Sequence, residues 1–377
     1  MIGGGQGAFI GAVHRMAAQL DGEYELVCGA FSSDPQKSRA SGDLLGLAPD
    51  RVYGSYQELI QREQQLPEEE RVQVISIVTP NHVHFEPAKM ALESGFHVVL
   101  DKPMTFSLEE ALELRQVAEA SGKLFCLTHT YTGYPMVKEA RQLVASGKLG
   151  KIRKVYVEYP QGWLSRFEEG GDNKQASWRT DPSQSGIAGA MGDIGTHAFN
   201  LAEYVSGLEV TQLCADINIV VEGRRLDDDG AVLLKFNNGA SGVLIATQVA
   251  AGEENNVTVR VYGEHGGIVW QQEDANTLQV KWLDRPTEIY RTGGGYVSSF
   301  AQHNTRTPAG HPEGYLEAFA NLYRNFALCV RAVLEGKEPE AEWQDYPGIA
   351  EGVRGMAFIE NVIASGKSDK KWLDFKV

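Results

Sequence analysis

The chain has 377 residues, and its 35 lysine and arginine residues against 50 aspartate and glutamate residues give a formal charge of −15. Such an acidic protein repels phosphate backbones and anionic lipid headgroups, so we expect neither nucleic acid nor a membrane surface as a partner. A content of 42% hydrophobic and 23% charged residues is typical of a globular protein, and the length predicts two or three domains.

The sequence also bears on the compartment. Its apolar runs, such as Val74–Val78, are far shorter than the roughly 20 residues of a membrane helix. The first residues lack the basic region and cleavage site of a secretion signal. The four cysteines are widely separated, and no Cys/His cluster has the spacing of zinc ligands. We therefore expect reduced thiols, no metal and a cytoplasmic location.

The first 128 residues alternate β-branched runs with helical patterns. Strands are predicted at Glu25–Phe31, Val74–Val78, Phe96–Leu100 and Leu124–Thr128. Helices are predicted at Pro87–Ser94 and Ser107–Ser121, each followed by glycine, and the second begins with a capping box, Ser107 to Glu110. This alternation predicts an α/β Rossmann domain with a parallel sheet over residues 1–128.

A glycine-rich segment precedes the first helical stretch. Gly3-x-Gly5-x-x-Ala8 fits the dinucleotide fingerprint: the first glycine makes the turn, the second admits the pyrophosphate, and the third small residue lets the helix pack on the strand. Only Met1 and Ile2 precede it, so either the chain as given omits several residues or the central strand is a stub. The predicted cofactor contacts here are Gly3, Gly5, Gln6, Gly7, Ala8, Phe9 and Ile10.

The end of the second predicted strand bears on cofactor choice. An acidic residue at this point usually binds the adenosine ribose, so Asp34 favours NAD. Ser32, Ser33 and Lys37 are an alternative site for the 2′-phosphate of NADP, which keeps NADP possible. Asp34-Pro35 is also a common helix start, with Asp34 as the N-cap.

Two further turns follow predicted strands. Thr79-Pro80-Asn81 follows Val74–Val78, and Asp101-Lys102-Pro103 follows Phe96–Leu100. Ligands of open α/β sheets bind at the carboxyl ends of strands, so we expect both turns to face the cofactor. Taken by spacing alone, Lys102 is equally a solvated lysine at a strand end.

The pattern changes in the second half of the chain. Strands are predicted in close succession at Ile152–Tyr159, Glu209–Val221, Ala231–Phe236, Gly239–Ala250 and Val257–Tyr262. Short turns join several of them, which predicts a large, mostly antiparallel or mixed sheet. Residues 129–377 are therefore expected to form an α+β domain.

One predicted helix of this half, Asp193–Ser206, carries an unusual face. Its apolar stripe consists of Ile194, Ala198, Leu201, Ala202 and Val205. Asp193 and His197, four residues apart, are neighbours at the margin of that stripe. Asp193 as an N-cap and His197 as a buried, hydrogen-bonded histidine are the structural alternative.

Together these motifs resemble the Gfo/Idh/MocA oxidoreductases, the family of glucose–fructose oxidoreductase and inositol dehydrogenase. The resemblance covers nearly the whole chain, and aspartate at position 101 replaces the family's usual glutamate, which keeps the charge and shortens the reach. It is greatest to a branch that includes levoglucosan dehydrogenase. Its carriers are Gly3–Gly11 with His14-Arg15, Thr79-Pro80-Asn81 with His84, Asp101-Lys102-Pro103, Trp178-Arg179, Gly192-Asp193-x-Gly195-x-His197 and His129–Pro135.

The resemblance implies an NAD(P)-dependent dehydrogenase that transfers hydride between the nicotinamide and a secondary hydroxyl of a sugar, anhydrosugar or cyclitol. It implies His197 as the base, Lys102 as the group that stabilises the alkoxide, and Asp193 as a group that holds the substrate or orients the imidazole. Further cofactor contacts are expected from Thr79, Pro80, Asn81, His84, Asp101, Lys102, Trp178 and Arg179. Substrate contacts are expected from Lys102, His129, Tyr131, Trp163, Asp193 and His197.

Two other functions remain open at this point. One is an enzyme that processes a glycoside through a transient ketone, and the other is a non-catalytic dinucleotide sensor or corepressor. Intact Lys102, Asp193 and His197 argue against the sensor, because a sensor needs no base. The second domain's sheet offers a face for self-association, so a homo-oligomer, a dimer or tetramer, is expected.

Overall fold

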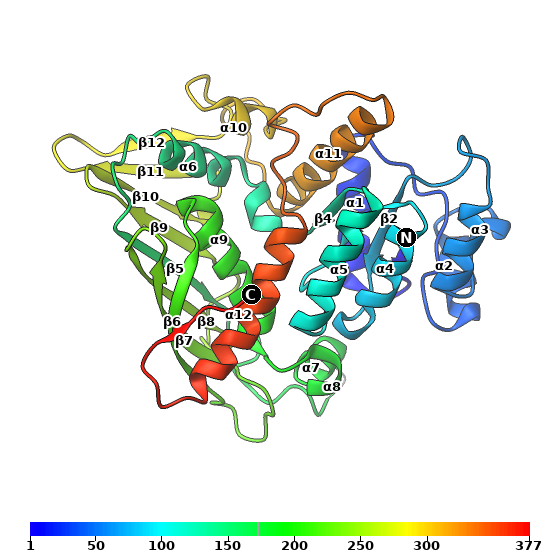
Figure 1. The fold of residues 1–377 in the computed structure, drawn as a ribbon, viewed down its shortest axis with the longest axis horizontal. Coiled ribbons are helices and arrows are strands. Elements are labelled where there is room, and N and C mark those ends of the chain that lie inside the picture. The colour runs from blue at the N-terminus through cyan, green and yellow to red at the C-terminus, as the bar shows by residue number, and fades with distance from the viewer. Residues whose placement is uncertain (172) are drawn as a thin grey trace. The chain divides into compact units, whose positions relative to one another are not determined.

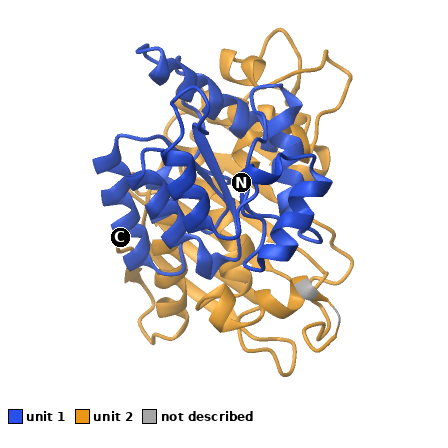
Figure 2. Cartoon of the chain, turned by 90° about the vertical axis from the view of Figure 1, so that its right-hand side faces the viewer, with its two compact units in different colours: residues 1–129, 319–353 blue, residues 130–318, 354–377 orange. Residues whose placement is uncertain are grey.

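The computed structural model describes residues 1–171 and 173–377 and divides into two compact units (Figures 1 and 2). Unit 1 comprises Met1–His129 and Phe319–Val353, and unit 2 comprises Thr130–Ala318 and Arg354–Val377. The sequence placed one boundary between residues 128 and 129. It did not anticipate the later segment that belongs to unit 1.

Unit 1 contains a parallel four-stranded sheet, as predicted. The strand order is β1 (Ile2–Gly3), β2 (Val74–Val78), β3 (His97–Leu100) and β4 (Phe125–Leu127). All four residues of β3 are buried, as expected for a parallel strand with helices on both faces. The helices of its first segment are α1 (Phe9–Leu20), α2 (Pro35–Leu44), α3 (Tyr56–Gln64), α4 (Phe85–Glu93) and α5 (Leu108–Ser121).

The predicted strand Glu25–Phe31 is wrong as a regular strand. Only two parallel bridges remain there, from Ala30 to Ile2 and from Gly29 to Val52. The physical reason is its partner: β1 spans two residues, so the neighbouring segment has little backbone to pair with. The bridges still keep this segment beside β1, where a Rossmann sheet has its second strand.

The helix signals in unit 1 are confirmed. Ser107 Oγ accepts a hydrogen bond from the backbone N–H of Glu110 at 3.2 Å. The carboxylate of Glu110 reaches the N–H of Phe106, one residue earlier than a capping box predicts. Gly122 ends α5 in the left-handed conformation, with φ of 63°.

Unit 2 is built on a nine-stranded mixed sheet (Figure 1). Its pairs are antiparallel except for β5 and β8, which run parallel. The strand order is β12 (Glu288–Arg291), β11 (Thr277–Trp282), β10 (Gly266–Gln271), β9 (Thr258–Tyr262), β5 (Lys154–Pro160), β8 (Ser241–Thr247), β7 (Asp229–Phe236), β6 (Val210–Asn218) and β13 (Leu373–Asp374). The predicted class, an α/β Rossmann domain followed by an α+β domain with a mixed sheet, is confirmed.

A central helix packs against this sheet. The predicted helix from Asp193 is a π-helical turn, Met191–Gly195, that continues into α9 (Thr196–Ser206). The predicted apolar stripe is buried, but so are Phe199 and Asn200 on other faces, so α9 is surrounded rather than amphipathic. The other helices are α6 (Pro135–Ala145), α7 (Lys174–Arg179), α8 (Pro182–Ser185), α10 (Ser299–His303), and α11 (Tyr315–Leu334) and α12 (Ile349–Gly366), which contain residues of both units.

Candidate active site

The glycine-rich loop between β1 and α1 depends on left-handed backbone. Gly3, Gly4 and Gly7 have φ of 79°, 70° and 78°, a conformation that residues with a Cβ rarely adopt. The N–H of Gly5 donates to the carbonyl oxygen of Phe31 at 3.2 Å, which fastens the loop to the end of the bridged segment. Glycine in this loop is therefore a requirement of its fold.

Two glycines are required by close packing. A Cβ on Gly5 would lie 2.8 Å from the carbonyl oxygen of Phe31, so this glycine serves the loop's own packing. A Cβ on Gly11 would lie 2.3 Å from the Cα of Gly4. The fingerprint does not name this close approach at Gly11. Ala8 is the N-cap residue of α1, and its role in helix packing stays a prediction.

The start of α1 fits an anionic group. Its N-cap makes no side-chain hydrogen bond, and its first turn carries no acidic residue. Gln6 and Gly7 are exposed, and nothing lies within 4 Å of a Cβ built on Gly7. The N–H groups and positive dipole end of α1 therefore fit the pyrophosphate of a dinucleotide. Contacts of Gln6, Phe9 and Ile10 with that group stay predictions.

Asp34 is a helix cap, as one of its two interpretations proposed. Its Oδ1 atom accepts from the N–H of Gln36 at 2.9 Å and of Lys37 at 3.3 Å. Its own N–H donates to Ser32 Oγ at 3.1 Å, and Ser33 is exposed. Ribose binding by Ser32, Ser33 and Asp34 stays a prediction.

His84 joins the two predicted strand-end turns. Its Nδ1 lies 2.7 Å from the carbonyl oxygen of Pro103 and its Nε2 lies 2.9 Å from that of Thr79. The ring is fully buried, and burial lowers its pKa although Asp101 opposes the shift. Thr79 and the Asp101–Pro103 turn are therefore brought together within unit 1, next to the 3₁₀ turn Asn81–Val83 that follows Pro80.

Asp101 points inward and anchors the turn that carries Lys102. Its Oδ1 atom accepts from the backbone N–H of Lys102 at 2.9 Å and from Thr128 Oγ1 at 3.0 Å. His14 Nε2 lies 3.8 Å from the same oxygen, and His14 Nδ1 is 2.7 Å from Tyr323 Oη. Burial alone would raise the pKa of Asp101, but His14 and Lys102 hold it well below its usual range. The carboxylate is thus ionised and fixes the backbone of Lys102.

His129 lies near Lys102 and Asp101 in unit 1. It is 2% exposed, and burial together with the charge of Lys102 lowers its pKa to about 3. The imidazole is therefore neutral at physiological pH, and its pKa responds to the ammonium of Lys102. A substrate contact of His129 stays a prediction.

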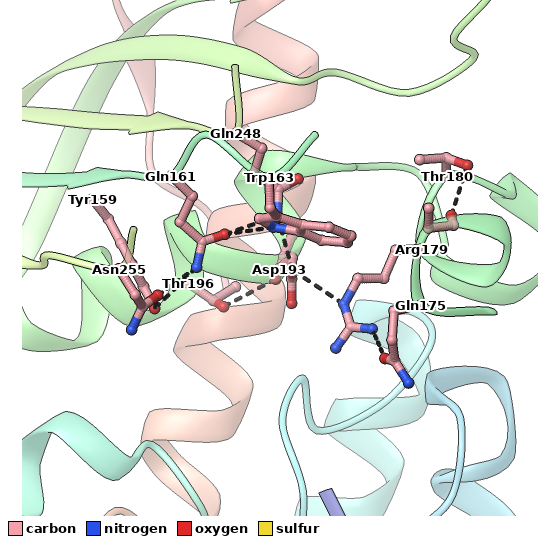
Figure 3. A network of polar contacts seen from close by, with 12 residues as sticks. Tyr159, Gln161, Trp163, Gln175, Arg179, Thr180, Asp193, Thr196, Gln248 and Asn255 are labelled. Carbon is pink, nitrogen blue, oxygen red and sulfur yellow. Dashed lines mark hydrogen bonds and ion pairs between the residues drawn. The ribbon is translucent and has the colours of Figure 1, made fainter. Parts of the chain in front are cut away.

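Asp193 is held on two sides within unit 2 (Figure 3). Its Oδ2 atom accepts from Gln248 Nε2 at 3.0 Å and lies 3.3 Å from Arg179 Nε. The Arg179 guanidinium also stacks on Trp178 at 4.2 Å from the ring centre. The segment before Asp193 is fixed by the buried carboxylate of Asp227, which accepts from the N–H groups of Gly189 and Met191. Asp193 is thus an oriented carboxylate beside a cation.

His197 lies against two tyrosines. It is 8% exposed, and its ring centre is 4.9 Å from that of Tyr131 and 6.3 Å from that of Tyr159. The two phenol hydroxyls are hydrogen-bonded to each other. Burial raises the pKa of both phenols, so they are neutral near physiological pH.

A row of amide side chains at the sheet edge was not anticipated from the sequence. Gln161 Nε2 donates to Asn255 Oδ1, and Gln248 Nε2 donates both to Asp193 and, at 3.4 Å, to Gln161 Oε1 (Figure 3). Trp163 Nε1 donates to Gln161 Oε1 at 3.0 Å, which joins the predicted Trp163 to Asp193. The sequence signal that could have indicated these residues is their position, because each amide residue lies just outside a strand.

The structure thus forms two groups of predicted residues, one in each unit. Unit 1 brings together the glycine loop, the turns at Thr79 and Lys102, and His129. Unit 2 connects Trp163, Arg179 and Asp193 by hydrogen bonds and ion pairing, and it packs Tyr131 on His197. Residues 1–171 and 173–377 contain no group of three or more potential metal ligands and no helix long and apolar enough to cross a membrane.

Comparison with known proteins identifies the family. Residues 1–129 match the oxidoreductase family with an NAD-binding Rossmann fold, and residues 137–269 match the GFO/IDH/MocA C-terminal domain. An oxidoreductase of known structure from Sinorhizobium meliloti is 44% identical with a TM-score of 0.89, and the match covers 99% of this chain and 98% of that one. This chain belongs to the Gfo/Idh/MocA family of oxidoreductases. The resemblance drawn from its motifs is confirmed, as is NAD as the cofactor.

Two further relatives have a bound ligand or a named activity. An inositol dehydrogenase homologue from Azotobacter vinelandii, solved with NADH and myo-inositol, is 34% identical with a TM-score of 0.90, covering 100% of this chain and 96% of that one. Levoglucosan dehydrogenase from Pseudarthrobacter phenanthrenivorans is 26% identical over 331 residues, which is 80% of each chain.

Proposed function

We propose that this NAD-dependent oxidoreductase is a dehydrogenase that oxidises a secondary hydroxyl of a sugar, anhydrosugar or cyclitol. The observation that carries the proposal is the Asp193–His197 group of unit 2, a fixed carboxylate and a buried imidazole in a family whose members bind such compounds. Support comes from the homologue solved with myo-inositol and from levoglucosan dehydrogenase.

In this proposal His197 is the base. Its ordinary pKa near 6.5 allows an imidazole to accept a proton at neutral pH, and the neutral phenols of Tyr131 and Tyr159 do not compete for it. Asp193, which is paired with Arg179, holds the substrate or orients the imidazole. When bound, NAD⁺ supplies the hydride acceptor.

Lys102 is the proposed electrophilic group. Its backbone is fixed by Asp101, and its ammonium would stabilise the developing alkoxide of the substrate. Trp178 and Arg179, like the strand-end turn at Thr79, remain proposed cofactor contacts, and NADP remains the alternative cofactor.

The test is turnover of a panel of sugars and cyclitols with NAD⁺ and NADP⁺, followed by absorbance of the reduced nicotinamide. Replacing the base, His197→Ala, should reduce kcat by about 10² to 10⁴ and leave NAD⁺ affinity nearly unchanged. The wild-type rate should fall as pH falls through the imidazole pKa, because the protonated ring accepts no proton. A folded His197→Ala protein with the wild-type rate would show that His197 is not the base.

Assembly and compartment complete the proposal. The outer face of the unit 2 sheet exposes apolar side chains on neighbouring strands, including Leu233 at 43% and Ile245 at 36% exposure. We propose a second copy of the chain as the cover for this face, in a dimer or tetramer. The cytoplasm is the proposed compartment, supported by four cysteines that form no disulfide within the described residues, of which Cys28, Cys126 and Cys329 are buried.

A further inference from the structure

Trp163 combines an exposed ring with a fixed backbone. Trp163 is 36% exposed, whereas the next residue, Leu164, is 1% exposed. The N–H of Gly162 donates to the carbonyl of Glu253 at 2.9 Å, and the carbonyl of Leu164 accepts from the buried Arg224 side chain at 2.9 Å. The tryptophan therefore stands on a segment that is held on both sides.

The edge of the indole is also held. Trp163 Nε1–H donates to Gln161 Oε1 at 3.0 Å, and an indole nitrogen can only donate. This requirement sets the orientation of the Gln161 amide, whose nitrogen then donates to Asn255 Oδ1. Asn255 Nδ2 in turn donates to Tyr131 Oη at 3.2 Å.

The opposite end of the network requires the same orientation. The carboxylate of Asp193 can only accept, so the Gln248 atom 3.0 Å away is the amide nitrogen. That nitrogen also faces Gln161 Oε1 at 3.4 Å, the atom already assigned as an acceptor. The Trp163 indole, which can only donate, and the Asp193 carboxylate, which can only accept, therefore require the same arrangement of the amide atoms between them (Figure 3).

A rigid, exposed indole suits a particular kind of ligand. When a ligand covers the broad apolar face of the indole, little further side-chain entropy is lost, because the ring is already held in one orientation. Saturated rings such as pyranoses and cyclitols present a flat C–H face together with hydroxyls at their rim. An open-chain polyol has hydroxyls but no such face. Trp178, which is expected to contact the cofactor, already has Arg179 over its ring.

We propose that Trp163, held by Gln161, is a stacking wall that selects saturated ring substrates over open-chain polyols. This inference rests on the proposed function and adds the residues that decide the substrate class. Trp163 contacts the ring, and Gln161 is a positioning residue that acts through Trp163.

The test compares dissociation constants of the NAD⁺-saturated protein for two rings, myo-inositol and levoglucosan, and for one open chain, D-sorbitol, by calorimetry. Trp163→Ala should raise the dissociation constant of the better-bound ring by about tenfold or more, which is the scale of a lost aromatic contact. The dissociation constant of D-sorbitol should change less than twofold. Trp163→Phe should lose only part of the ring preference. Trp372→Phe, at a tryptophan that contacts Lys235, is the matched control and should change neither.

The role of Gln161 has its own comparison. Gln161→Leu removes the acceptor for the indole and should reduce the ring-to-sorbitol preference several-fold. Gln161→Glu retains that acceptor and should restore most of the preference, which a merely structural role for Gln161 would not produce. Equal weakening of rings and D-sorbitol by Trp163→Ala, or no ring preference in the wild type, would overturn the inference. If the rings bind with the expected pattern but no polyol reduces NAD⁺, the proposed dehydrogenase activity is refuted. The role of Trp163 as a stacking wall is then still supported.

Discussion

The contact between α1 and the glycine loop predicts a large effect from one methyl group. In Gly11→Ala the new Cβ would lie 2.3 Å from Gly4 Cα and 2.6 Å from the Gly4 carbonyl oxygen, where ordinary contacts begin near 3.4 Å. Helix α1 or the loop must therefore move by about 1 Å. Strain of this kind costs about 1–3 kcal/mol, and the loop N–H groups that face the pyrophosphate move with it.

The expected result is a weaker affinity for NAD⁺. A misplaced hydrogen bond to a charged group costs about 1.5–3 kcal/mol, so Kd should rise about 10-fold to 100-fold. Titration of NAD⁺ by calorimetry measures it, with circular dichroism to verify folding. Ala8→Gly is the matched variant: its effect should be small, because Ala8 is the N-cap residue and glycine is accepted there. Wild-type affinity for NAD⁺ in Gly11→Ala would refute the packing argument.

Two further predictions concern stability. His97 Nδ1 accepts from the N–H of Leu124 at 3.0 Å, and burial with Lys123 lowers its pKa to about 4. Its contribution of about 3 kcal/mol is complete above pH 6.5 and is lost as pH falls toward 4; His97→Asn should flatten this part of a denaturation-versus-pH profile. Arg224→Met should cost about 3–5 kcal/mol in urea denaturation, because it leaves Asp228 and Glu169 without their buried partner. The exposed control Arg153→Met should cost under about 1 kcal/mol, and equal losses in both variants would contradict the assignment of Arg224 as a buried anchor.

The first domain could be predicted well because its signals are local. The capping serine Ser107, the terminating Gly122 and the apolar run Val98–Leu100 each specify their own structure. The strand expected at Glu25–Phe31 failed because its pairing depends on the length of a neighbour, β1, and not on its own β-branched residues.

The close approach at Gly11 was missed for a different reason. The fingerprint is a spacing rule, and five glycines within the first eleven residues satisfy several spacings. Only the positions of Gly4 and Gly11 in space show which small residue allows the helix to approach. Asp34 illustrates the same limit, since a cap and a ribose ligand require the same residue type at the same place.

Part of the candidate site in the second domain could be predicted from the sequence. Asp193 and His197 are close in sequence, so helical spacing and the family motif were enough to propose them. Gln161 follows β5, whereas Gln248 and Asn255 lie in the connection between β8 and β9, with 87 residues between Gln161 and Gln248. They meet because β5 and β8 run parallel while β9 runs antiparallel to β5, which puts the ends of β5 and β8 and the start of β9 at one edge.

That arrangement explains why the missed residues are amides. The Trp163 indole can only donate hydrogen bonds, and Gln161 Oε1 is its acceptor; the Asp193 carboxylate can only accept them, and Gln248 Nε2 is its donor. The two glutamines meet where Gln248 Nε2 donates to Gln161 Oε1. A carboxylate at position 161 would keep this acceptor but lose the hydrogen bond that the Gln161 nitrogen donates to Asn255, and an apolar residue at position 161 or 248 would leave one end of the path unsatisfied. Strand direction therefore determines where these residues meet, and the two end groups determine which residue type can stand between them.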